Sequence, residues 1–127
     1  MTVTDWARFI TLHLRSDPAN PNRRVDLLSP RAFEHLHRAS PGETYAPGWA
    51  VDIFDPAKGA RPDDKGMVFG HGGSNGYWYC KVLVAPEIDL AVLVVCNRGG
   101  AAVGGKAVAA VAVELMQKFT SNPKTSK

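Results

Sequence analysis

The residues best suited to chemistry lie together in the run Gly70-His71-Gly72-Gly73-Ser74-Asn75-Gly76, which places an imidazole, a hydroxyl and an amide among four glycines. Glycine weakens the interior of a strand, so its repetition here indicates that another backbone or a ligand approaches closely. A loose glycine turn or a bulge between two strands would explain the same composition. The run is therefore the first candidate for a site, with a purely structural turn as the alternative.

Motifs for other kinds of site are weak or missing. The triplet His71-Gly72-Gly73 also matches the oxyanion loop of lipases, but no G-x-S-x-G nucleophile turn follows it. The four histidines and the two cysteines, Cys80 and Cys96, show no metal-ligand spacing, and His35 and His37 would point in different directions on a helix. Acidic residues are isolated, which argues against a paired-carboxylate mechanism. We expect no metal and no cofactor.

Two short helices should precede the candidate run. Thr4 is a suitable N-cap for a first helix, which carries apolar residues at helical spacing and should end near Ser16, before a segment rich in proline and asparagine. Ser29-Pro30 predicts the start of a second helix, whose inner face would carry Phe33, Leu36 and His37.

Alternating apolar residues then predict strands. Tyr45 to Phe54 reads as one half-buried strand, and an exposed loop, Asp55 to Lys65, leads to a second strand through Met67, Val68 and Phe69. Trp78 to Ala85 and Leu90 to Cys96 form a hairpin around Pro86-Glu87-Ile88-Asp89. If Ala85 faces Leu90, both faces of this hairpin are apolar, so helices should cover both, and Cys80 and Cys96 lie on opposite faces, too far apart for a disulfide.

A final helix and the overall composition complete the outline. A helical stripe on the last helix is formed by Val108, Val111, Ala112, Leu115, Met116 and Phe119. We expect a single domain over residues 1–119 and a disordered tail over residues 120–127. The net charge is only +3 and is scattered, which does not suggest nucleic acid, and no apolar run is long enough to span a membrane.

The order of these features resembles the C-terminal part of the serine β-lactamase and penicillin-binding-protein superfamily, in particular its class C β-lactamase and esterase-like branch. The features are a strand at Gly48-Trp49, the His71-Gly72-Gly73 triplet, the apolar hairpin, a strand closing on Asn97 and a terminal helix. The resemblance implies an α+β fold, namely an antiparallel sheet of about three strands with helices on its faces, as a partial β-lactamase-like fold.

The resemblance also implies an acyl-enzyme hydrolase acting on a β-lactam, ester or amide. His71 and Ser74 would be the catalytic residues: the Ser74 backbone N–H would donate to the oxyanion hole, and His71 would orient and assist near the substrate or the base. Gly72, Gly73 and Asn75 would border the small-molecule acyl substrate. A hydrogen-bonded structural histidine at a strand end is the alternative for His71.

The chain departs from this family where the nucleophile should be. Its one S-x-x-K match, Ser121-Asn122-Pro123-Lys124, lies in the polar tail and contains a helix-breaking proline, and neither Tyr-x-Asn nor Ser-x-Asn occurs. We therefore expect the isolated chain to be inactive. Leu90 to Cys96 would form an open sheet edge, which a second copy or a separate N-terminal half would complete. The alternative is a non-catalytic interaction or small-ligand-binding module that retains the scaffold.

Overall fold

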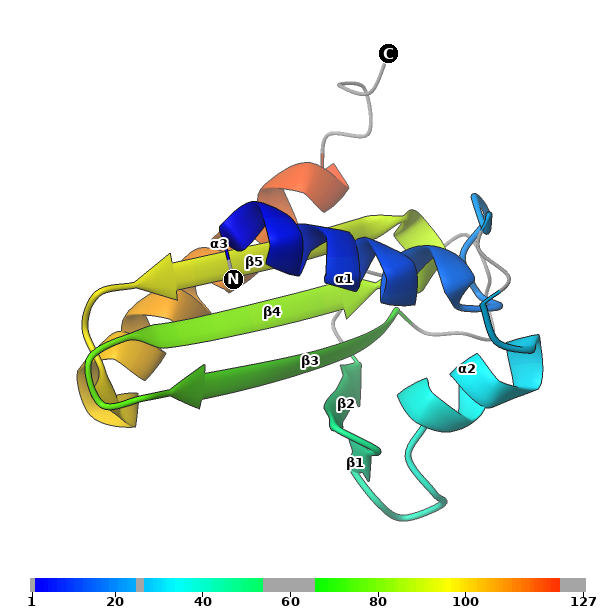
Figure 1. The fold of residues 1–127 in the computed structure, drawn as a ribbon, viewed down its shortest axis with the longest axis horizontal. Helices are drawn as coiled ribbons and strands as arrows, with labels where there is room; N and C mark the ends of the chain where they lie inside the picture. The colour runs from blue at the N-terminus through cyan, green and yellow to red at the C-terminus, as the bar shows by residue number, and fades with distance from the viewer. Residues whose placement is uncertain (1, 25–26, 54–65, 122–127) are drawn as a thin grey trace.

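A computed structural model describes residues 2–24, 27–53 and 66–121. These residues form three α-helices and one antiparallel sheet of five strands, which follow one another across the sheet in chain order. In Figure 1, α1 (Val3–Ser16) crosses one face of the sheet and α3 (Lys106–Ser121) lies behind the other. The α+β class with helices on the sheet faces is thereby confirmed.

The expectation of about three strands is wrong. The described strands are β1 (Tyr45–Ala46), β2 (Trp49–Ile53), β3 (Met67–Ser74), β4 (Tyr79–Ala85) and β5 (Leu90–Cys96). Two of them, β1 and β2, come from the segment that the alternation predicted as one strand. Pro47 and Gly48 divide that segment, because a proline followed by a glycine at φ +85° reverses the chain and pairs Ala46 with Trp49.

The expected β4–β5 hairpin is confirmed with its register. Ala85 pairs with Leu90, and Pro86–Ile88 forms a single turn of 3₁₀ helix (η2) between the strands. Cys80 pairs with Val95 and Tyr79 with Cys96, so the two cysteines lie on opposite faces. Both are free thiols.

The glycine run is part strand and part turn. β3 continues to Ser74 with unbroken pairing to β4, so it contains no bulge. A Cβ at Gly70 would lie 2.5 Å from the Val82 carbonyl oxygen, which confirms that another backbone approaches closely there. The remaining residues, Asn75 to Trp78, form the tip of the β3–β4 hairpin.

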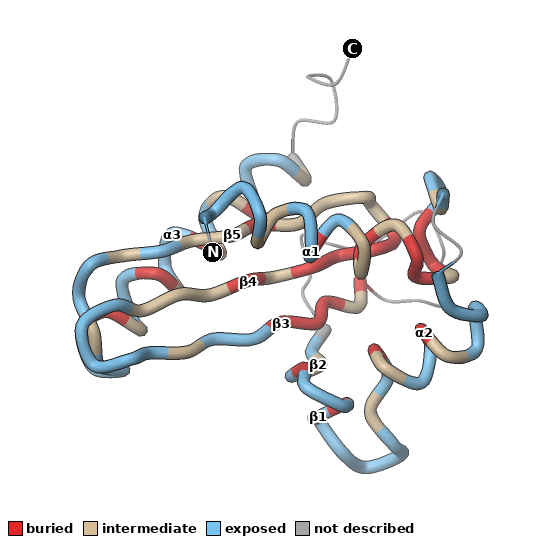
Figure 2. Tube along the Cα trace, in the orientation of Figure 1, coloured by how far each residue is buried: buried red, intermediate tan, exposed pale blue. Residues whose placement is uncertain are grey.

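The sheet has an apolar core on each face. Figure 2 marks buried positions along β3 and β4, in the middle of the sheet. On the α1 face, Ile10 and Leu14 pack against apolar side chains of the strands, which are Ala46, Trp49, Phe69, Val82 and Val84. On the α3 face, Ala112 and Met116 pack against Val68, Ala85 and Val92. The half of β3 that leads to Ser74 is mostly exposed, so the sheet extends beyond both cores at that end.

The helices begin and end close to the expected positions, with one correction. Thr2, not Thr4, caps α1: its hydroxyl accepts from the Asp5 N–H at 3.1 Å while the Asp5 carboxylate accepts from the Thr2 N–H at 3.1 Å. This reciprocal capping box satisfies two backbone N–H groups at once, those of Thr2 and Asp5. A cap at Thr4 could not do so. α2 (Pro30–His37) begins after its Ser29 cap as predicted.

The chain enters α3 through η3 (Gly100–Gly105), a turn of π-helix. Val108, Ala112 and Met116 are buried as predicted, whereas Val111 and Phe119 are exposed, so the buried stripe is narrower than expected. α3 ends at Ser121, two residues beyond the expected end at Phe119. Residues 122–127 of the expected tail, and the expected loop Asp55 to Lys65, lie outside the described residues.

The turn after η2 is tied to the segment that follows α1. Asp89 has φ +50°, and its carboxylate accepts hydrogen bonds from Asn20 Nδ2 at 2.9 Å and Asn22 Nδ2 at 3.0 Å, with Arg15 at 3.5 Å. Aspartate tolerates this left-handed conformation better than most residues. The contact fixes the C-terminal end of α1 over the sheet.

None of the helices in the described residues has the length and apolar character needed to span a membrane.

Candidate functional site

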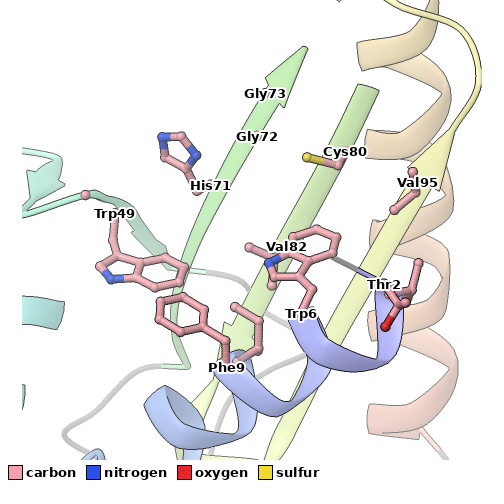
Figure 3. Close-up of a pocket in the computed structure, with 13 residues that line it drawn as sticks. Thr2, Trp6, Phe9, Trp49, His71, Gly72, Gly73, Cys80, Val82 and Val95 are labelled. Atoms are coloured by element: carbon pink, nitrogen blue, oxygen red, sulfur yellow. The ribbon is translucent and has the colours of Figure 1, made fainter. Parts of the chain in front are cut away.

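Three residues of the candidate run, His71, Gly72 and Gly73, border a pocket between α1 and the sheet, which we call the α1–β3 pocket, whereas Ser74 and Asn75 do not line it. Its volume is about 460 Å³, and Trp6 and Phe9 of α1 form one wall. Figure 3 shows these rings and Trp49 gathered beside α1, with His71 farther along β3. The other lining residues are Thr2, Val3, Ile10, Gly48, Gly72, Gly73, Cys80, Val82 and Val95. A volume in this range suits a small organic ligand.

His71 lies at the exposed part of β3, opposite Val82 of β4. It therefore projects from the face that carries Phe69 and Val82, which is the α1 face. Within the described part of the chain, no hydrogen bond holds the imidazole. The alternative of a hydrogen-bonded structural histidine thus gains no support, and the ring is available to a ligand.

The segment from His71 to Ser74 pairs on one side only. β2 pairs with β3 from Met67 to Gly70, and β4 pairs with β3 through Ser74. In an antiparallel strand, alternate residues direct their N–H and C=O groups away from a given partner. This stretch of β3 therefore directs backbone donors and acceptors outward beside the α1–β3 pocket, where no described strand takes them.

The side chains of Ser74 and Asn75 build the hairpin tip. Ser74 Oγ donates to the Trp78 carbonyl oxygen at 2.7 Å and accepts from the N–H groups of Gly76 at 3.1 Å and Gly100 at 3.3 Å. Asn75 Oδ1 accepts from the N–H groups of Tyr77 at 3.1 Å and Trp78 at 2.9 Å. Both polar groups are thus engaged in the turn. The expected roles of the Ser74 backbone and of Asn75 toward a substrate stay predictions.

Replacing Ser74 with alanine should lower the free energy of unfolding by about 1–2 kcal/mol, because three hydrogen bonds at an exposed turn are lost and water replaces them only in part. Urea unfolding of the purified variant measures this. Ser40→Ala, at an exposed hydroxyl, is the matched control and should change stability by less than about 0.5 kcal/mol. Equal stability of the two variants would contradict a structural role for the Ser74 hydroxyl.

The two glycines of the triplet contribute differently to the pocket. A Cβ at Gly73 would meet nothing within 4 Å, so glycine there leaves open space opposite Cys80. A Cβ at Gly72 would make ordinary contacts with Tyr79 and the Cys80 carbonyl oxygen, at 3.4 Å or more. The absence of a side chain at Gly73 therefore widens the pocket. A side chain at Gly72 or Gly73 would cause no steric clash, so neither position has to be glycine.

The part of the chain that the structure describes contains no cluster of histidine, cysteine and carboxylate groups that could hold a metal ion. His35 lies on the exposed side of α2, away from the buried His37. Their separation agrees with the expectation that two histidines two residues apart on a helix diverge.

Sequence reasoning missed a buried polar group that joins α1 to α2. His13 Nδ1 lies 2.9 Å from His37 Nε2, and His37 Nδ1 lies 2.6 Å from Asp17 Oδ2. His37 and Asp17 are fully buried. The available signal was that His13 and His37 fall on the apolar faces of α1 and α2, because polar groups in such positions need partners. We call this group the Asp17–His37–His13 chain.

The pKa of His13 is lowered to about 4, first because burial disfavours the charged ring and then because His37 lies beside it. A histidine in the unfolded chain has a pKa near 6.5, so the unfolded state binds the proton more readily. The stability that this contributes is complete above about pH 6.5 and is lost as the pH falls toward 4.

We expect the free energy of unfolding to fall by about 1–2 kcal/mol between pH 6.5 and 4 from His13 alone, a value reduced for the partial exposure of the ring. Urea unfolding at a series of pH values measures the slope. His13→Asn keeps a polar atom near the Nδ1 position and does not titrate, so this variant should show a flatter profile above pH 5. An unchanged slope would contradict the assignment.

Comparison with family models, curated proteins and solved structures finds no match. The function must therefore be argued from the site. The α1–β3 pocket supplies an exposed imidazole, outward-facing backbone groups and apolar walls, whereas the Asp17–His37–His13 chain lies behind one of those walls.

Proposed function

We propose that this chain is the C-terminal portion of a β-lactamase-like serine hydrolase and supplies the third-motif strand to a composite active site. The observation that carries the proposal is the position of His71 in the α1–β3 pocket, at the start of the stretch of β3 that pairs on one side only. The family resemblance of His71-Gly72-Gly73 gives these positions their roles. The attacking hydroxyl belongs to a separate N-terminal half with an S-x-x-K motif.

In this site, the seryl oxygen of the partner half bonds to the carbonyl carbon of a β-lactam, ester or amide, and the C–N or C–O bond breaks. The hydroxyl proton passes to a base on that half and then to the leaving group, and water later hydrolyses the acyl-enzyme. The Ser74 N–H donates to the developing oxyanion. His71 orients the substrate beside it, and Gly72, Gly73 and Asn75 border the acyl group.

Two surfaces support the need for a second polypeptide. Val3, Phe9 and Val95 line the pocket and are 57%, 50% and 39% exposed, an apolar opening that a partner would cover. β5 is the outer strand of the sheet and has no charged residue between Leu90 and Cys96. Natural proteins protect such edges or pair them. The N-terminal half would pair with β5 and place its serine at the pocket.

Covalent labelling with a fluorophosphonate or a labelled penicillin tests this proposal. The isolated chain should remain unlabelled, and mixing it with an N-terminal half that carries S-x-x-K should give labelled serine on that half. His71→Ala should slow labelling of the mixture by roughly 10²-fold. His35→Ala, a second exposed histidine, should leave the rate unchanged. An unchanged labelling rate in His71→Ala, or a stable complex whose serine never becomes labelled, would refute the hydrolase proposal.

A second candidate is a non-catalytic module that binds a small ligand or a second copy of the chain. The observation that favours it is that the pocket is formed by this chain alone, while the Ser74 hydroxyl is used in the turn. Sedimentation distinguishes a second copy of the chain from a separate N-terminal half as the partner. Self-association that persists when the N-terminal half is in excess supports a homo-oligomer. Binding of a hydrophobic probe such as anilinonaphthalene sulfonate without any labelling supports the ligand-binding module.

A further inference from the structure

A second pocket adjoins the α1–β3 pocket at the tip of the β3–β4 hairpin, and we call it the tip pocket. Its volume is about 360 Å³, and Trp78 lines it without lining the α1–β3 pocket. Three residues line both pockets, namely Gly73, Cys80 and Val95. The two pockets are therefore parts of one groove, which we call the α1-face groove.

The three shared residues form one row across the sheet. Gly73 pairs with Cys80, and Cys80 pairs with Val95. Figure 3 shows them on three neighbouring strands, beyond the rings of the α1–β3 pocket. The row lies on the α1 face, because Cys80 and the core residue Val82 are alternate residues of β4. With no side chain at Gly73 and a small one at Cys80, this row leaves a low floor between the two pockets.

Large apolar side chains lie exposed along the groove. All three tryptophans of the sequence line it, Trp6 and Trp49 in the α1–β3 pocket and Trp78 in the tip pocket. Trp78 is 53% exposed. Apolar residues left exposed together on one surface indicate that a ligand or a partner covers them.

The groove offers no charged partner to a ligand. Among the described residues, those that line it include no aspartate, glutamate, lysine or arginine. The side-chain oxygens of Ser74 and Asn75 are hydrogen-bonded within the turn, whereas the His71 imidazole has no such bond. A charge removed from water without a partner costs much free energy. The groove therefore suits an uncharged apolar ligand whose polar group lies beside His71.

The spacing along β4 gives the length of such a ligand. Val82, opposite His71, and Trp78 are four positions apart, which corresponds to about 13 Å at a rise of about 3.3 Å per residue. With carbon–carbon bonds of about 1.5 Å, an extended chain of roughly ten carbon atoms covers this length. A chain of four carbon atoms would end within the α1–β3 pocket.

We propose that the α1-face groove binds an uncharged, unbranched acyl chain of about ten carbon atoms, with its carbonyl group beside His71 and its end against Trp78. The proposal rests on the proposed hydrolase in one respect, namely that this carbonyl group is the one attacked. Binding of the chain does not require the second polypeptide. Among the substrates considered above, the groove favours a neutral ester or amide over a β-lactam that carries a carboxylate.

A nitrogen-15 NMR titration of the 127-residue chain tests the proposal. The probes are N-methylbutanamide, N-methylhexanamide, N-methyloctanamide and N-methyldecanamide, each kept below its aggregation concentration. The affinity should rise about threefold to fourfold with each methylene group. The indole N–H signal of Trp49 should shift with every probe, and that of Trp78 with the longest chains alone. An affinity independent of chain length, or a Trp78 signal that decanamide leaves in place, would overturn the proposal.

Sodium decanoate tests the requirement for an uncharged ligand. It has the same chain and carries its charge where the amide lies, so it should bind at least about tenfold more weakly than N-methyldecanamide. Equal affinity of the two compounds would overturn this part of the proposal.

Two variants test the path of the chain. Trp78→Ala should weaken binding of N-methyldecanamide roughly tenfold, the effect of about two buried methylene groups, and should leave N-methylbutanamide unchanged. Tyr77→Ala is the matched control, because Tyr77 is the neighbouring aromatic residue, is 80% exposed and lines neither pocket. Gly73→Val places a side chain in open space at the middle of the row and should block the longer chains. Equal losses in Trp78→Ala and Tyr77→Ala, or full affinity in Gly73→Val, would refute the proposal.

The outcomes also separate this proposal from the hydrolase and from a second copy of the chain as the occupant. Binding that depends on chain length, combined with no labelling of the mixture with an N-terminal half, rejects the hydrolase and retains the groove. Labelling without any such dependence rejects the acyl chain and retains the hydrolase. If sedimentation shows a dimer that N-methyldecanamide dissociates, the groove belongs to a second copy, and the proposal is overturned.

Discussion

Replacing Asp17 with alanine is expected to lower the free energy of unfolding by about 3–5 kcal/mol. The carboxylate is fully buried and accepts from His37 Nδ1 at 2.6 Å and from the Ala19 N–H at 2.9 Å. Its removal leaves two buried donors without a partner, and water cannot reach them in a closed core. For a domain with a total stability of about 5–15 kcal/mol, this is a large fraction.

Urea unfolding measures the effect, with Glu114→Ala as the matched control because Glu114 is exposed on α3. Asp17→Asn should recover part of the loss, since the amide oxygen still accepts one of the two hydrogen bonds. A double-mutant cycle with His37→Phe isolates the pair: the double variant should lose much less than the sum of the two single losses. Additive losses would show that the two side chains act independently, contrary to the hydrogen bond described above.

Local signals in the sequence were enough for the elements that depend on near neighbours. The β4–β5 register follows from the short loop Pro86-Glu87-Ile88-Asp89, because the length of a hairpin loop determines which residues pair on its two sides. Ser29-Pro30 fixed the start of α2 for a similarly local reason. The Pro47-Gly48 turn was an equally local signal, and neglecting it merged β1 and β2 into one predicted strand.

The site was predictable only in the part that one strand provides. His71 and Gly73 share the pocket because alternate residues of β3 lie on the same face of the sheet, and Gly72 borders the pocket as the backbone between them. The apolar wall was not predicted, because Trp6 and Phe9 reach the pocket only once α1 packs across the sheet. An amphipathic helix indicates that one face is buried, but it does not indicate which strands that face will cover.

The Asp17–His37–His13 chain shows the same limit more clearly. His13 and His37 are separated by 24 positions, and neither the spacing nor the composition around them matches a known motif. The pairing arises from the packing of α1 beside α2, which the residues around either histidine do not indicate. The sequence did contain one signal, namely histidines on helix faces that are otherwise apolar. Burying such polar groups costs free energy unless they are hydrogen-bonded.

Gly99→Ala is the second substitution with a large expected effect. The added Cβ would push the tip of the β3–β4 hairpin away from the connection between β5 and α3. A Cβ at Gly99 would lie 2.0 Å from the Gly76 carbonyl oxygen and 2.8 Å from the Tyr77 nitrogen, both backbone atoms. The φ of Gly99 is −77°, so alanine itself is unstrained there and only the close approach opposes it.

We expect Gly99→Ala to lower the free energy of unfolding by about 2–3 kcal/mol, as for an overpacked contact that must move backbone apart. The shift should also stretch the hydrogen bond from the Gly100 N–H to Ser74 Oγ, so amide exchange at Gly100 should accelerate. Gly73→Ala is the control, since its Cβ would meet nothing within 4 Å, and it should cost less than about 1 kcal/mol. If the two variants are equally stable, the hairpin tip does not depend on its contact with Gly99, and the outward-facing end of β3 would be held by β4 alone.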